Sequence, residues 1–219
     1  MYSQDYVKRM IEQLGAFLLA LRDLLADNRL NEAREQIDLA YREALHLDPQ
    51  TVRDMPDDVL ILGTAMSRVG DMDKSIVLGD LLSADGDWHE RSGDYDTAQV
   101  CYFKAANVLT EALLRQPFGM AQDYVERIDA LVLKAEQFDV PYDTRWRLFR
   151  YHERVKRYAG AEDDLFDLLD VSPDDENLRD EGIAFYQRLL MLKDHELLLG
   201  GLPRAEVQAG IEELTKRDA

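Results

Sequence analysis

The stretch that decides the fold runs from Gly86 to Ala105 and reads GDWHERSGDYDTAQVCYFKA. Gly93 and Asp94 stand between two helix-forming runs, and the small residue Ala98 follows where two helices would come closest. This order of residues is typical of a helical hairpin. We therefore expect two antiparallel helices joined by a short turn at Gly93.

The same stretch resembles the turn and second helix of a tetratricopeptide repeat (TPR). Six residues fall on the usual positions of that repeat: Gly86, Gly93, Tyr95, Ala98, Tyr102 and Ala105. A second match, of nearly regular length, comprises Leu148, Tyr158, Ala161, Leu169 and Pro173. The resemblance implies an all-α fold of irregular antiparallel helical hairpins, stacked as a TPR-like solenoid or superhelix of about 9 to 11 helices. It implies little about activity, because such repeats act by presenting a surface.

The spacing of the turns predicts helices of unequal length. Gly70 and Gly93 are 23 residues apart, whereas a full repeat needs about 34. We therefore predict one long helix from Asp73 to Arg91 that ends one hairpin and begins the next. Gly86 lies inside this helix at a cost of about 1 kcal/mol relative to alanine, which is tolerated if a neighbouring backbone approaches closely.

Apolar residues at helical spacing predict the remaining helices. These cover 4–26, 33–48, 59–70, 95–116 (ended by Pro117 and Gly119) and 121–135, then a helix after Pro141 capped by Asp143, a helix that starts at Ser172, Pro173 and Asp175, and a closing helix over 203–217 that covers the apolar end. The stretch from Thr51 to Asp58 is polar and is predicted to be irregular. Because no Pro-rich or Ser/Gly-rich linker interrupts the chain, we expect a single TPR-like domain over 1–219.

The chain also resembles a bacterial family of uncharacterised proteins with TPR-like helices. The resemblance is carried by DYVKRMIEQL at Asp5–Leu14 and by GLPRAEV at Gly201–Val207. It implies the same architecture and a cytoplasmic location. Since that family has no established activity, the resemblance supplies no functional residue.

Charge and cysteine content narrow the possible partners. With 44 acidic and 26 basic residues the net charge is −18, so the field repels phosphate backbones and anionic membrane surfaces, and we expect neither nucleic acid nor membrane as a partner. The single Cys101 excludes an internal disulfide and favours the cytosol. Met1–Gly15 lacks the layout of a secretory signal, and the apolar run Ala16–Leu21 is far shorter than the roughly 20 residues of a membrane span.

The residues that carry chemistry do not form a recognisable active site. None of the four histidines has a second histidine at helical spacing, and no nucleophile elbow, phosphate loop or dinucleotide fingerprint is present. In the group Asp85, Asp87, His89 and Glu90, only Asp85 and His89 share a helix face, and we interpret the group as an exposed acidic surface. The sequence therefore predicts a protein that is not an enzyme and has no cofactor and no metal.

One basic strip stands out in this acidic chain. It comprises Arg145, Arg147, Arg150, Arg154, Lys156 and Arg157, interleaved with Trp146, Phe149, Tyr151 and His152. Arg147, Arg150 and Arg154 share one helix face and suit an acidic or phosphorylated peptide, because guanidinium groups pair bidentately with carboxylates and phosphates. The alternative, which we favour, is internal pairing with the acidic residues of the next helix: Glu162, Asp163, Asp164, Asp167 and Asp170.

The predicted helix over 4–26 has an apolar face wider than one partner helix can cover. Either it packs against both its neighbour and the next layer, or the surplus face forms a homodimer.

Two functions from different classes fit these features. The first is a non-enzymatic scaffold that binds a protein or peptide, with Trp88, Trp146 and Tyr151 as aromatic anchors beside Arg147, Arg150 and Arg154. The alternative is a sensor that binds a small molecule or signal peptide in a pocket between helices, and a pocket of roughly 300 Å³ or more lined by Tyr and Met would favour it.

Overall fold

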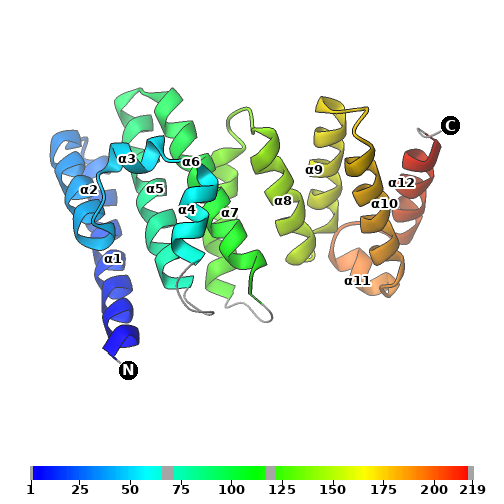
Figure 1. Cartoon of the computed structure of the whole chain (residues 1–219), viewed down its shortest axis with the longest axis horizontal. Coiled ribbons are helices and arrows are strands. Elements are labelled where there is room, and N and C mark those ends of the chain that lie inside the picture. The colour runs from blue at the N-terminus through cyan, green and yellow to red at the C-terminus, as the bar shows by residue number, and fades with distance from the viewer. Residues whose placement is uncertain (1, 66–71, 117–121, 217–219) are drawn as a thin grey trace. The chain divides into compact units, whose positions relative to one another are not determined.

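The computed structural model describes residues 2–65, 72–116 and 122–216, and in these ranges the chain forms helices and no strand. Twelve helices are present there (Figure 1): α1 (Tyr2–Ala26), α2 (Leu30–Leu45), α3 (Pro49–Asp54), α4 (Asp57–Ala65), α5 (Met72–Ser92), α6 (Tyr95–Leu114), α7 (Gln122–Ala135), α8 (Tyr142–Arg154), α9 (Tyr158–Val171), α10 (Glu176–Leu190), α11 (Asp194–Leu199) and α12 (Arg204–Lys216). The predicted all-α class is confirmed. The breaks predicted at Gly70, Pro117 and Gly119 lie outside the described residues.

Two six-residue helices, α3 and α11, raise the helix count above the expected value. The prediction of an irregular stretch from Thr51 to Asp58 is wrong, since α3 covers part of it. Asp48 caps α3 by accepting a hydrogen bond of 2.9 Å from the backbone N–H of Gln50, and Pro49 occupies the first turn, where a missing N–H costs nothing. Such short helices give no apolar periodicity to read.

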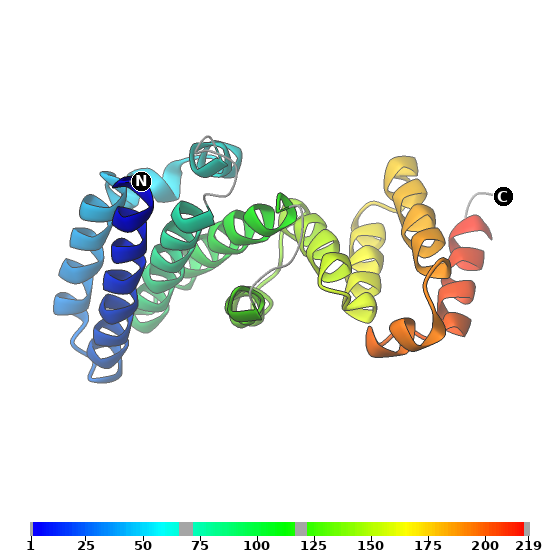
Figure 2. The ribbon, with the colours of Figure 1, turned by 90° about the horizontal axis from the view of Figure 1, so that it is seen from below.

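The helices group into two compact units, Met1–Val140 and Pro141–Ala219. In the first unit α5 and α6 form the central hairpin, with α1 and α2 against α5 and with α4 and α7 against α6. Figure 2 shows α4 and α7 on opposite sides of this hairpin. The single long helix predicted over 73–91 is confirmed by α5. The single TPR-like domain over 1–219 stays a prediction.

In the second unit α8 and α9 form a hairpin, and α10 packs against both α9 and α12. Its core is centred on Phe149, Leu165, Phe185 and Tyr186, none of which has exposed surface. The predicted closing helix is confirmed by α12, which buries Val207 and Leu214 in this core.

The cap predicted for the helix after Pro141 is wrong. Pro141 occupies the N-cap position of α8 and makes no side-chain cap hydrogen bond, whereas Asp143 lies two residues later, inside the first turn. The negative charge of Asp143 still interacts favourably with the positive, N-terminal end of the helix dipole.

Three hairpins share one kind of turn. Asn28, Gly93 and Lys156 adopt the left-handed conformation, with φ of 58°, 85° and 63°. In each turn the next backbone N–H donates to a carbonyl five residues earlier: Arg29 to Leu24 at 2.9 Å, Asp94 to His89 at 2.9 Å and Arg157 to His152 at 2.8 Å. This is the Schellman arrangement that ends many helices. Five residues after each left-handed residue lies a fully buried alanine: Ala33, Ala98 and Ala161.

Gly86 is explained by a side chain and not, as predicted, by a neighbouring backbone. A methyl group placed on Gly86 would lie 2.5 Å from Cε1 of Tyr102, across the α5–α6 interface. The ring of Tyr102 therefore occupies the space that any larger residue at position 86 would need.

The long helix predicted over 4–26 is confirmed by α1. Among its described side chains Leu14, Leu21 and Leu25 are buried, whereas Leu19 is 57% exposed. The side chains before Leu14 lie outside the described residues. The homodimer through this helix stays a prediction.

Candidate functional site

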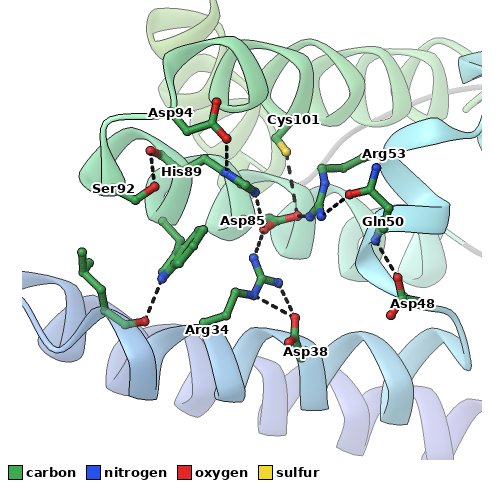
Figure 3. A network of polar contacts seen from close by, with 12 residues as sticks. Arg34, Asp38, Asp48, Gln50, Arg53, Asp85, His89, Ser92, Asp94 and Cys101 are labelled. Atoms are coloured by element: carbon green, nitrogen blue, oxygen red, sulfur yellow. Dashed lines mark hydrogen bonds and ion pairs between the residues drawn. The ribbon is translucent and has the colours of Figure 1, made fainter.

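A fully buried carboxylate joins four helices of the first unit. Asp85 in α5 accepts a hydrogen bond from Nη1 of Arg34 in α2 at 2.6 Å and another from Nη1 of Arg53 in α3 at 2.5 Å (Figure 3). Sγ of Cys101 in α6 lies 3.8 Å from the same carboxylate. We call Asp85, Arg34, Arg53 and Cys101 the Asp85 cluster. Two guanidinium groups offset the charge that burial would otherwise penalise.

Neighbouring polar groups hold the two arginines in place. Arg34 also contacts Asp38 one helical turn away, at 2.6 Å, and Arg53 donates from Nη2 to Gln50 at 2.9 Å. Each guanidinium thus contacts a second acceptor besides Asp85, and this contact restricts the orientation of its plane.

His89 lies at the edge of the cluster. Its Nε2 is 3.6 Å from Oδ1 of Asp85 and its Nδ1 is 3.0 Å from Oδ2 of Asp94 (Figure 3). Burial lowers the pKa of His89, and the carboxylate of Asp85 opposes that effect only in part. Because the neutral form is favoured, this histidine joins the end of α5 to the turn mainly by hydrogen bonding.

The prediction of an exposed acidic surface at 85–90 is wrong for Asp85, which α2 and α3 cover completely. Asp87 is half-buried and accepts hydrogen bonds from Tyr102 at 2.8 Å and from Lys134 of α7 at 2.5 Å. The cationic partners lie 51, 32 and 47 residues from the acids they pair with, so no local pattern indicates the pairing.

The Asp85 cluster is suited to holding helices together. Both carboxylate oxygens are occupied by guanidinium groups, and burial raises the pKa of the Cys101 thiol well above its usual range, so the reactive thiolate is disfavoured. In the described part of the chain no group of three His, Cys, Asp or Glu side chains is placed to hold a metal ion. The geometry therefore favours a structural role for these residues.

A second buried carboxylate belongs to the α8–α9 hairpin. Asp164 is 2% exposed, and its oxygens lie 2.7 Å from Nδ1 of His152 and 3.1 Å from Nη1 of Arg145. Arg145 also reaches Asp167 at 3.2 Å. For Arg145 the favoured interpretation, internal pairing with the next helix, is confirmed.

The other arginines of the strip differ in exposure. Arg147 is half-buried and donates to the backbone carbonyl of Asp143 at 3.0 Å, whereas Arg150 and Arg154 are exposed. A binding role for these three stays a prediction.

The three predicted aromatic anchors take part in helix packing. Nε1 of Trp88 donates to the carbonyl of Leu30 at 2.8 Å, and the guanidinium of Arg34 lies 5.0 Å from its ring centre. Trp146 packs against the core of the second unit beside Phe149. Tyr151 has no exposed surface. Roles in partner binding for Trp88, Trp146 and Tyr151 stay predictions.

Two surface features were not predicted from the sequence. One is an open groove of about 520 Å³ between α1 and α2, lined by Phe17, Ala20, Leu21, Asp23, Leu24, Asp27, Arg29, Glu32 and Gln36. We call it the α1–α2 groove. The other is an apolar corner at the end of α10 and in α11, where Met191, Leu198 and Leu199 are 87%, 63% and 85% exposed. A run of leucines with one buried member, Leu197, was the available signal for the corner.

None of the described helices has the length and apolar character needed to cross a bilayer. Comparison with curated proteins and with solved structures finds no match. Residues 1–218 match a family of unknown function (DUF6483). Because the match spans nearly the whole chain, the protein belongs to this family of unknown function.

Proposed function

We propose that the protein is a non-enzymatic scaffold that binds a protein or peptide through TPR-like helical hairpins in the cytoplasm. The apolar corner carries this proposal, because three large apolar side chains within 191–199 are more than half exposed. Isolated exposed apolar residues are common, whereas several within a short segment of the chain are typical of protein contact sites.

The buried ionisable groups support the same function. Asp85 and Asp164 are engaged by arginine and histidine side chains from neighbouring helices, and the Cys101 thiol is buried. Catalytic acids, bases and nucleophiles need access to a substrate. The interactions of these groups instead hold neighbouring helices in position.

The sensor remains the second candidate because the α1–α2 groove exceeds the volume that a small ligand needs. The groove is open to solvent, however, and its lining contains neither Tyr nor Met. A protein or peptide partner is therefore the better-supported ligand.

The scaffold is tested by capture from the cell of origin. Tagged wild-type protein is compared with a Leu198→Ser/Leu199→Ser variant, and a Leu133→Ser/Val171→Ser variant serves as the matched control because those two residues are also well exposed but lie in α7 and α9. We expect a stoichiometric partner on the wild type and the control and its loss from the corner variant. The same captured proteins on all three would argue against the corner, and no stoichiometric partner on the wild type would argue against the scaffold.

A further inference from the structure

The α1–α2 groove has an apolar floor. Leu21 is buried, Phe17 and Leu24 are half-buried, and Ala20, which also lines the groove, is exposed. The volume of about 520 Å³ is large enough for two or three side chains of a bound segment.

The rim of the groove is acidic. Asp23, Asp27 and Glu32 contribute three carboxylates, and the only cation among the lining residues, Arg29, donates from Nε to Glu32 at 2.7 Å. Asp27 also interacts electrostatically with Arg29, so three carboxylates share one cation and the lining keeps a net negative charge. Asp23 also meets Arg22 at 3.8 Å, but both side chains are about three-quarters exposed, so water screens the pair.

Apolar floor and acidic rim together specify the ligand. We propose that the α1–α2 groove binds a basic amphipathic peptide segment of a partner protein, with apolar side chains on Phe17, Leu21 and Leu24 and with Lys or Arg beside Asp23 and Asp27. This inference rests on the proposed scaffold function and adds a second surface to it. Helices with an apolar face commonly dock in such grooves, and the net charge of −18 attracts a cationic segment from a distance.

A second copy of the chain fits this groove less well. A symmetric contact through α1 would place the same acidic rim on both sides, and like charges across an interface are unfavourable. The charge of the groove thus favours a different protein over the homodimer.

The test uses two synthetic helical peptides with identical leucine spacing, one with lysine and one with glutamate at the polar positions. Fluorescence anisotropy measures their affinity for the full chain at low and high salt. We expect the lysine peptide to bind, the glutamate peptide to fail, and binding to weaken as salt increases.

Three variants locate the site. Ala20→Trp fills the groove from an exposed position, and Asp23→Lys/Asp27→Lys reverses the charge of the rim. Each variant is expected to lower the affinity for the lysine peptide about tenfold or more. Asp170→Lys/Asp180→Lys, exposed in the second unit, makes the same change in net charge and is expected to retain the affinity. Circular dichroism and unfolding curves check that each variant folds.

Equal affinity for all variants would overturn the groove as the site. Dimerisation of the wild type that Ala20→Trp abolishes, without peptide binding, would assign the groove to a second copy and also overturn the inference. If the lysine peptide fails to bind while a cellular partner is captured through Leu198 and Leu199, the inference fails and the scaffold function stands. Absence of both peptide binding and a partner would contradict both.

Discussion

Asp85 and Arg53 are 32 residues apart in the chain, yet Oδ2 of the carboxylate and Nη1 of the guanidinium lie 2.5 Å apart. With Arg34 on the other oxygen, this contact ties α2 and α3 to α5. The short helix α3 is thereby held by an ion pair, in addition to the burial of Val52. Stability of the first unit should depend on this carboxylate.

We expect Asp85→Ala to destabilise the protein by about 3 to 5 kcal/mol, because two largely buried guanidinium groups lose their counter-charge. Urea unfolding measures the change. Replacing the charged set together, as Asp85→Leu with Arg34→Met and Arg53→Met, should recover most of the loss. Glu35→Ala, exposed on α2, is the control and should change stability by less than about 0.5 kcal/mol.

Cys101 reports opening of the same cluster. Since it is the only cysteine, labelling by a thiol reagent follows one site. Burial raises the pKa of its thiol, and the carboxylate of Asp85 raises it further, so we expect labelling of the folded protein to be at least about a hundredfold slower than in denaturant. Asp85→Ala should accelerate it. Labelling at the denatured rate without denaturant would show that the thiol is accessible.

The raised pKa of Asp80 makes the stability of the protein depend on pH. Burial raises its pKa from 3.8 to about 6, and Arg127, whose side chain is 42% exposed, compensates only in part. The folded state therefore binds the proton more tightly than the unfolded state. The resulting stabilisation is complete below about pH 4 and is lost as the pH rises to about 6, by about 3 kcal/mol in total.

Asp80→Asn removes this titration. Between pH 4 and 6 the difference in unfolding free energy between wild type and variant should shift by about 3 kcal/mol, in the direction that favours the variant at higher pH. Asp96→Asn, at an exposed position of α6, is the control for the loss of one carboxylate. Parallel curves for wild type and Asp80→Asn would mean that the pKa of Asp80 is not raised.

Local sequence predicts the hairpins because each turn signal lies within a few residues of the turn. Gly93, Asp94 and the buried Ala98 are such a set, and the hairpin between α5 and α6 is where they predict it. The turn at Lys156 is of the same kind, but lysine carries no turn preference, so only the following Tyr158 and Ala161 indicate it.

The buried ion pairs could not be predicted in this way. Asp85 lies among other acidic residues, a pattern that is typical of a solvated helix face. Its burial depends on α2 and α3, which cover it in the folded chain. In the second hairpin the carboxylate comes from the other helix: Asp164 follows Ala161 by three residues, as Cys101 follows Ala98. Equivalent places between the two helices of each hairpin thus hold a carboxylate near arginine and histidine, supplied from different positions of the sequence.

The turns at Gly93 and Lys156 differ in how well the residue suits the left-handed backbone, with φ of 85° and 63°. A side chain disfavours this conformation by roughly 1 kcal/mol, whereas glycine adopts it freely. We expect Lys156→Gly to stabilise the protein by about 0.5 to 1 kcal/mol and Gly93→Ala to destabilise it by about 1 kcal/mol. No atom lies within 4 Å of a methyl group placed on Gly93. The loss of stability in Gly93→Ala would therefore measure backbone strain alone.

Asn28 completes the comparison, because asparagine tolerates the left-handed region better than lysine does. In chemical unfolding, substitution by glycine should therefore raise the free energy of unfolding more at Lys156 than at Asn28. A substitution of Arg150, which is exposed within α8, to glycine should instead cost about 1 kcal/mol, since a helix interior disfavours glycine. If Lys156→Gly destabilised the protein as much as Arg150→Gly, position 156 would behave as helix and the shared turn would be wrong there.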